Sequence, residues 1–177
     1  MAAPAQDWSA EAHAVLQASA IRQVAYVPDA GLSRLLARCE ADNQMRDVLL
    51  ANEAEGVAML AGAWLGGERG VLLMQSSGIG NVIAPLSLVK ACRFPFLTIV
   101  TMRGEWGEVN PWQVPMGTAG PAQLEAAGVI VYKVGRAEEA GETAAAAAQL
   151  AFESQAAVAV LISQRVIGAK AFTAVQR

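Results

Sequence analysis

Two carboxylates in the segment Asn52–Gly56 are the first candidates for chemistry. Glu53 falls where an expected strand ends and an expected helix begins, and Glu55 lies two residues further on. Two residues correspond to about 200° of rotation around a helix, so these carboxylates do not form a facing pair. Glu53 is either an acidic residue that the helix dipole favours in the first turn, or a carboxylate that faces a crevice and hydrogen-bonds a heterocycle. Spacing alone favours the first interpretation.

The segment Gln75–Asn81 follows an expected strand and opens an expected helix. Gly78 and Gly80 would let the backbone approach a ligand closely, and a helix N-terminus favours anions. The segment is not a dinucleotide-binding fingerprint, because position 83 is Ile where that motif has glycine, and it has no P-loop lysine. The two glycines therefore mark either an anion-binding turn or only a tight turn between a strand and a helix.

Three further side chains could take part in chemistry or in structure. Asp29 follows the first expected strand, where the usual role of aspartate is to form a turn or to cap a helix. Arg103 follows the fourth expected strand, and its planar guanidinium either binds a ligand anion or is solvated on a loop. His13 is the only histidine and falls in an expected helix from Ala10 to Ala20, so we interpret it as structural or surface-exposed.

Short β-rich segments alternate with Ala- and Leu-rich helical segments along the whole chain. This alternation predicts an α/β fold with a parallel sheet of about six strands and helices on both faces. We expect a single domain over residues 1–177, with residues 1–8 as a flexible tail, and a binding crevice at the carboxyl ends of the strands. The expected strands are Gln23–Val27, Asp47–Ala51, Val71–Gln75, Phe96–Met102, Val129–Val134 and Ala157–Ser163.

The segment from Met102 to Gly117 stands out because it is long and loop-like. It contains Trp106, Pro111, Trp112 and Pro115, together with several glycine and asparagine residues. A loop of this length inside a compact domain is usually functional or forms a partner surface. We therefore expect it to contact a ligand or another chain.

Composition excludes several classes of function. The net charge is −3 and no basic patch is visible, so we expect no nucleic-acid partner. No apolar run is long enough to span a membrane, and the N-terminus does not resemble a signal peptide. Cys39 and Cys92 are the only cysteines, which favours a reducing cytoplasm, and a single histidine excludes a multi-histidine metal site.

Taken together, five segments resemble the pyrimidine-binding domain of thiamine-diphosphate-dependent decarboxylases. The resemblance runs in order from about Tyr26 to Gly117, and it is closest to the sulfopyruvate decarboxylase α subunit and to phosphonopyruvate decarboxylase. It implies that the chain adopts the thiamine-diphosphate-binding fold. The segments that carry it are Val27–Asp29, Asn52–Trp64, Met74–Asn81, Arg103–Glu105 and Gln113–Gly117.

The resemblance also implies roles for individual residues. Glu53 matches the glutamate that hydrogen-bonds the aminopyrimidine ring of the cofactor and promotes its imino tautomer, and Asp29 matches an acidic group used in proton transfer. Arg103 is our choice for the distal anion of the substrate, since the match supports its location more than its role. The expected cofactor-binding residues are Glu53, Gln75, Gly78, Gly80 and Asn81, and the expected substrate-binding residues are Arg103, Gln75 and Gln113.

The Gly-Asp-Gly motif that holds magnesium in this family does not occur in the sequence. The resemblance therefore implies a hetero-oligomer in which a β subunit binds the diphosphate and Mg²⁺. The expected activity is conversion of 3-sulfopyruvate to sulfoacetaldehyde and CO2, with phosphonopyruvate or another 2-oxo acid as alternative substrates. Two other interpretations stay open: a non-catalytic module that binds an anion or a nucleotide, and a structural or regulatory partner that has lost the chemistry.

Overall fold

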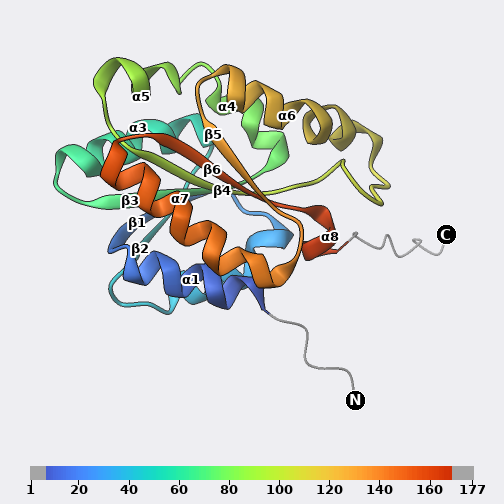
Figure 1. Ribbon diagram of the computed structural model, residues 1–177, viewed down its shortest axis with the longest axis horizontal. Coiled ribbons are helices and arrows are strands. Elements are labelled where there is room, and N and C mark those ends of the chain that lie inside the picture. Colours follow the sequence, from blue (N-terminus) through green and yellow to red (C-terminus); the bar gives the residue numbers. More distant parts are fainter. Residues whose placement is uncertain (1–6, 169–177) are drawn as a thin grey trace.

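Six parallel strands form one sheet, as the computed structural model of residues 7–168 shows (Figure 1). From one edge to the other, the strands are β2 (Arg46–Leu49), β1 (Ile21–Tyr26), β3 (Arg69–Gln75), β4 (Phe96–Thr101), β6 (Ala157–Ile162) and β5 (Ile130–Val134). All five strand pairs are parallel. The predicted α/β fold with six strands is confirmed, and each predicted strand overlaps the observed one to within two residues at either end.

Helices cover both faces of this sheet (Figure 1). One face carries α1 (Trp8–Ala18), α2 (Ser33–Glu40) and α7 (Ala140–Ser154). The other carries α3 (Glu53–Leu65), α4 (Ile79–Val82), α5 (Ser87–Cys92) and α6 (Val114–Ala126). Short turns of helix complete the chain: η1 (Ala30–Leu32), η2 (Ser76–Gly78), η3 (Pro111–Gln113), η4 (Ala137–Glu139) and α8 (Gln164–Ile167).

Strand β3 shows why two helical layers are needed. Its side chains alternate between the faces, with Val71 and Leu73 in the core under α1 and α7, and Leu72 and Met74 in the core under α3 and α4. All four are fully buried, which is the pattern of a central strand in a parallel sheet. The central strands are thereby fixed, and with them the loops that leave their carboxyl ends.

Two segments differ from the sequence-based expectation. Asp7 caps α1 and Trp8 is buried in the core, so these two residues belong to an ordered helix start and not to a tail; residues 1–6 lie outside the described residues. The expected long loop ends at Asn110, because η3 and α6 already occupy the rest of the segment. Proline suggested a loop there, but proline is well tolerated in the first turn of a helix, where its missing N–H is not needed.

Helices begin at the carboxyl edge of the sheet and end at its amino edge. The carboxyl ends of β1, β2, β3 and β4 lead into η1, the start of α3, η2 and the segment 102–110. The amino ends of β4, β5 and β6 follow the last residues of α5, α6 and α7. Within residues 7–168, no helix is both long and apolar enough to cross a bilayer.

Candidate functional site

The start of α3 separates the two carboxylates that the sequence singled out. Asn52 is the N-cap, and its side chain accepts a hydrogen bond of 2.9 Å from the Ala54 N–H. Glu55 folds back and accepts a hydrogen bond of 3.1 Å from the Ala51 N–H. Both are ordinary capping interactions. Glu53 takes no part in the capping, and its side chain reaches the neighbouring strand-to-helix connection instead.

Glu53 is held in place by η2 and α4, which form that connection. Its side chain is buried, and its Oε2 accepts a hydrogen bond of 2.7 Å from Asn81 Nδ2. A Cβ atom at Gly78 would overlap Glu53 Oε1, so only glycine leaves room for this carboxylate. The sequence-based expectation that Glu53, Gly78 and Asn81 belong to one site agrees with this geometry. Gly80 is exposed and borders Met116 rather than Glu53.

Asp29 is the second carboxylate of this edge, and three donors hold it. Its Oδ1 accepts a hydrogen bond of 2.7 Å from Gln75 Nε2. Its Oδ2 accepts hydrogen bonds of 2.9 Å from the Gly31 N–H and from Thr101 Oγ1. Asp29 therefore caps η1, as expected for its turn position, and also ties together the carboxyl ends of β1, β3 and β4.

Arg103 does not present the free cation that the sequence suggested. Its Nε and Nη2 donate hydrogen bonds of 2.7 and 2.8 Å to the two carboxylate oxygens of Glu108. The side chain is buried, and the guanidinium lowers the pKa of Glu108 from its usual 4.5 to about 2. The same hydrogen bonds raise the pKa of Arg103. This bidentate pair argues against Arg103 as the group that meets a substrate anion, because its charge is already matched.

The backbone of Arg103 is joined to the site through Ser76. The Arg103 N–H donates a hydrogen bond of 3.0 Å to Ser76 Oγ, which in turn donates one of 3.2 Å to the Arg103 carbonyl. Ser76 is fully buried and begins η2, which ends at Gly78 beside Glu53. The segment after β4 is thus coupled to the turn that shapes the Glu53 site.

Gln113 lies in the wall of this region. It is buried at the end of η3, and its Oε1 has no hydrogen-bond partner among residues 7–168. A Cβ atom at Gly104 would overlap the Gln113 carbonyl oxygen, and one at Gly117 would overlap the Arg103 carbonyl oxygen. Glycine at both positions lets the start of α6 pack directly on the backbone after β4. The structure places Gln113 close to Gly104, and its expected contact with substrate stays a prediction.

Sequence analysis missed the residues that complete these clusters, which are Thr101, Glu108 and Gln164. Each is a common polar residue with no motif around it, so no local signal distinguishes it. The best available signal was position, because Thr101 and Gln164 lie at or just past the carboxyl ends of β4 and β6.

The turn at Gly78 and Gly80 does not form an extended anion site. The helix that it opens, α4, has only four residues, and the Gly78 position is filled by the Glu53 carboxylate. A favourable helix dipole requires a longer run of aligned peptides, and a carboxylate repels an anion. This geometry favours the interpretation of Gly78 as part of a tight turn, where the missing side chain leaves space for the Glu53 carboxylate.

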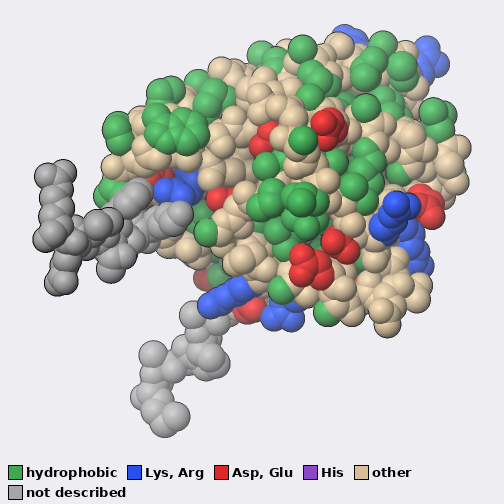
Figure 2. Space-filling view, turned by 180° about the vertical axis from the view of Figure 1, so that it is seen from behind, with side chains coloured by type: hydrophobic (Ala, Val, Ile, Leu, Met, Phe, Trp, Pro, Cys, Tyr) green, Lys and Arg blue, Asp and Glu red, His purple; other side chains and the backbone are tan. Residues whose placement is uncertain are grey.

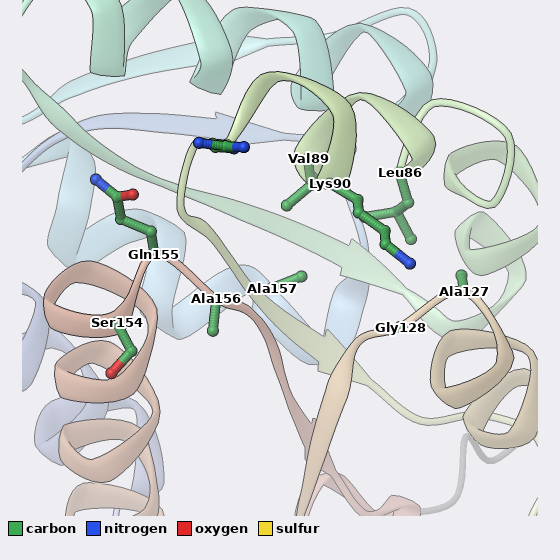
Figure 3. A pocket seen from close by; sticks show the side chains of 10 residues that line it. Leu86, Val89, Lys90, Ala127, Gly128, Ser154, Gln155, Ala156 and Ala157 are labelled. Atoms are coloured by element: carbon green, nitrogen blue, oxygen red, sulfur yellow. The ribbon is translucent and has the colours of Figure 1, made fainter.

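One cavity lies at the other edge of the sheet. It has a volume of about 430 Å³ and is bordered by the amino ends of β4 and β6, with Lys90 reaching into it (Figure 3). It lies opposite Glu53 and Asp29, and three helices end around it with the C-cap residues Arg93, Ala127 and Gln155. Within residues 7–168, no three His, Cys, Asp or Glu side chains gather in a way that could hold a metal ion.

The carboxyl edge can therefore offer one kind of chemistry. Glu53 is a buried carboxylate with one oxygen fixed by an amide and its position fixed by glycine. Such a group can accept a hydrogen bond from, or exchange a proton with, a nitrogen atom of a bound heterocycle. Asp29 supplies a second carboxylate at the same edge, and its backbone and side-chain partners hold it still.

Sequence comparison identifies decarboxylases as relatives of this chain. It is 33% identical over 145 residues to the sulfopyruvate decarboxylase subunit alpha of Methanococcus maripaludis, a match that covers 81% of this chain and 87% of that subunit. It is 42% identical over 89 residues to the phosphonopyruvate decarboxylase of Streptomyces viridochromogenes, covering 50% of this chain but 22% of that enzyme. No family model matches the chain.

A solved structure shares the fold. The 2-oxoglutarate:ferredoxin oxidoreductase from Magnetococcus marinus matches with a TM-score of 0.70, covering 91% of this chain and 29% of that chain. Sequence identity is 15%, so this likeness concerns the fold alone. The match thus involves a domain-sized part of that larger chain.

Proposed function

The chain belongs to the family of sulfopyruvate decarboxylase α subunits, and on that basis we propose that it provides the pyrimidine-binding half of a thiamine-diphosphate-dependent site that decarboxylates 3-sulfopyruvate. The products would be sulfoacetaldehyde and CO2. The observation that carries the proposal is Glu53, a buried carboxylate whose position is fixed by Asn81 and Gly78.

Glu53 fits the proposed cofactor because its carboxylate can hold a proton against a ring nitrogen. Asn81 donates a hydrogen bond to Glu53 Oε2, and the space beside Glu53 Oε1 exists only because residue 78 has no side chain. Burial strengthens a hydrogen bond to Glu53, since water competes less for it. Thiamine diphosphate, when bound, supplies the electron sink for loss of CO2 from a 2-oxo acid. The work of this chain is to orient the heterocycle and to exchange a proton with it through Glu53.

Asp29 is proposed as the second proton-handling group, and Gln75 as the residue that sets its position. Gln75 donates to Asp29 Oδ1 and accepts a hydrogen bond of 2.7 Å from Ser77 Oγ. This chain of contacts leads from the Gln75–Asn81 segment to Asp29, so the same turn positions both carboxylates. Gly80 and Gln113 remain proposed contacts to the cofactor and the substrate, respectively.

A partner subunit is proposed to supply the rest of the site. The relatives from Methanococcus maripaludis and Methanocaldococcus jannaschii are named subunit alpha, and this chain spans only 22% of the phosphonopyruvate decarboxylase that it resembles. Diphosphate and Mg²⁺ require oxygen ligands around a hard cation. We assign them to the partner, because the Gly-Asp-Gly motif that holds magnesium in this family does not occur in this sequence.

The substrate class is proposed to be a 2-oxo acid with a second anion, and 3-sulfopyruvate is the first choice because the α subunits in the family carry that name. Phosphonopyruvate is the nearest alternative. Since Arg103 is paired with Glu108, we propose that the partner subunit provides the cation that meets this second anion.

The test is decarboxylation by the complex of this chain with its partner subunit, in the presence of thiamine diphosphate and Mg²⁺. Glu53→Gln should lower kcat by about 100-fold or more, because the amide keeps the shape but cannot exchange a proton. Glu55→Gln is the matched control from the same helical turn and should retain wild-type activity, since Glu55 only caps the helix.

Either of two results would overturn the proposal. One is wild-type activity in Glu53→Gln. The other is a wild-type complex that binds the cofactor but decarboxylates neither sulfopyruvate nor phosphonopyruvate. Comparing kcat/KM for these two substrates and for pyruvate, which lacks the second anion, then assigns the substrate.

A further inference from the structure

Four large apolar side chains are exposed in the nine-residue segment 106–114, which follows β4. They are Trp106, Val109, Trp112 and Val114, with exposed fractions of 43%, 58%, 63% and 39%. The other large apolar side chains exposed among residues 7–168 are dispersed over β2, α3, α5 and β5. Single exposed apolar residues are normal, but a cluster with two tryptophans indicates an interaction site. We call these four residues the tryptophan surface.

This surface is built on an ordered segment. Glu105 Oε1 accepts hydrogen bonds of 2.6 and 2.7 Å from Ser163 Oγ and the Gln164 N–H. Gln164 is fully buried, and its Oε1 accepts hydrogen bonds of 3.3 and 3.2 Å from the Glu105 and Trp106 N–H groups. Glu105 is thus tied to the start of α8, and Trp106 remains exposed. A surface held in this way loses little conformational freedom when a partner binds.

Glu108 completes the same network on the other side of the segment. Its carboxylate accepts hydrogen bonds from Gln164 Nε2 at 3.0 Å and from the N–H groups of Val109 and Asn110 at 3.1 and 3.0 Å. Together with the Arg103 pair, these contacts fix the backbone that carries Val109 and leads to Trp112. Buried polar groups therefore support an apolar outer face.

The border of the surface carries a positive charge. The Arg165 guanidinium lies 4.9 Å from the centre of the Trp106 ring, a cation–π arrangement, and Arg165 is exposed. Tryptophan and arginine are among the residues most enriched at the energetic centres of protein interfaces. The complementary face should have an apolar pocket for a tryptophan and a carboxylate within reach of Arg165.

The surface is continuous with the Glu53 site. Arg103, three residues before Trp106, shares two hydrogen bonds with Ser76, and the residue after Gln113 begins α6 against Gly104. Hydrophobic side chains gather over the end of the molecule where α6 begins, on the left of Figure 2. A chain bound here would reach the same carboxyl edge of the sheet that holds Glu53.

We propose that the tryptophan surface is the docking face for the partner subunit that completes the decarboxylase. This inference rests on the proposed function. It favours the partner over a second copy of this chain, because the missing part of the site must meet the carboxyl edge. Two relatives that are named decarboxylase without a subunit label are also more than four times as long as their match to this chain. Docking here would bring the partner to the Glu53 edge.

The test measures the affinity of the separately purified partner subunit for this chain by isothermal titration calorimetry. Trp112→Ser and Trp106→Ala should each raise Kd roughly tenfold or more, as for truncated anchor residues at other interfaces. Leu65→Ser is the matched control, since Leu65 is 87% exposed on α3, and its Kd should stay within about twofold of wild type. Circular dichroism and Tm confirm that each variant is folded.

The outcomes separate this inference from the proposed function. At saturating partner concentration, Trp112→Ser should recover wild-type kcat, whereas Glu53→Gln should not. Unchanged Kd in both tryptophan variants overturns the docking face, and so does loss of self-association with partner binding intact, which would assign the surface to a second copy. A complex that needs Trp112 but decarboxylates neither anionic substrate supports the docking face and refutes the proposed function.

Discussion

The carboxyl and amino edges of the sheet are made by the same strands, yet they carry opposite kinds of groups. At the carboxyl edge, α3 begins with Glu53 and Glu55, and hydrogen bonds fix every acidic side chain described above. At the amino edge, α5 ends with Lys90 in its last turn, and a cavity of about 430 Å³ lies between helix C-termini. Helix dipoles explain the difference, because N-termini favour carboxylates and C-termini favour cations.

This comparison shows that the cavity at the amino edge is not the better candidate site. Lys90 and Arg93 sit at the end of α5, where basic residues interact favourably with the helix dipole. Their presence therefore needs no ligand to explain it. Glu53 is different, because burying a carboxylate is costly and only a specific arrangement with Asn81 and Gly78 holds it there.

We expect the largest loss of activity from a glycine-to-alanine substitution at the carboxyl edge of the sheet, compared with the same substitution at the amino edge. Gly78→Ala should lower decarboxylation by the complex on the order of 100-fold, because the new Cβ would overlap Glu53 Oε1 and displace the carboxylate. It should also destabilise the fold by about 1–3 kcal/mol. Steady-state kinetics and urea unfolding measure the two effects.

Gly128→Ala is the matched control at the amino edge. Gly128 has φ +87°, and a Cβ atom there would meet no other atom within 4 Å. Alanine should therefore cause backbone strain of about 1–2 kcal/mol without disturbing the Glu53 site. Activity per folded complex should not change. If Gly78→Ala lost no more activity than Gly128→Ala, the distinction between the two edges would fail.

The next effect concerns the pH dependence of stability. The folded-state pKa of Glu108 is about 2, below its usual 4.5, so its ionisation stabilises the fold at neutral pH by up to about 3 kcal/mol. This contribution is fully present above about pH 4.5 and is lost as the pH falls towards about 2.

Glu108→Gln isolates this contribution. The free energy of unfolding should be lower than that of wild type at neutral pH, and the difference should narrow as the pH falls below about 4.5. Urea titrations at a series of pH values measure it. Glu105→Gln controls for the loss of a carboxylate on the same segment. A wild-type minus Glu108→Gln difference that does not vary with pH would contradict the assigned ion pair with Arg103.

The smallest effect is expected at the amino edge. Arg93 ends α5 with φ +55°, a left-handed conformation that glycine adopts without strain. Arg93→Gly should change stability by no more than about 1 kcal/mol, in the stabilising direction, and leave activity unchanged. Gln155 lies at the equivalent end of α7 with φ +51°. Gln155→Gly should therefore also raise the Tm slightly in thermal unfolding. A marked loss of activity in Arg93→Gly would assign the amino edge a role in function.

Sequence patterns predicted much of this fold because the signals were local. Alternating β-rich and helical segments located all six strands, and the junction before Glu53 correctly indicated a helix start. The proline-containing segment after β4 was predicted to be a loop throughout, although its second half is helical. The error arose because proline disfavours a helix interior but fits a first turn, and sequence alone did not show where α6 begins.

The sequence by itself determined which acidic and amide residues follow which strand, and therefore at which edge of the sheet they meet. Only the tertiary structure decided their partners. Asn81 donates a hydrogen bond to Glu53, which is 28 residues away in the sequence, and Thr101 donates one to Asp29, which is 72 residues away. Glu108 accepts hydrogen bonds from the guanidinium of Arg103. Such pairings depend on side-chain geometry after packing, because polar groups that leave water must find donors or acceptors among whatever elements the fold brings beside them.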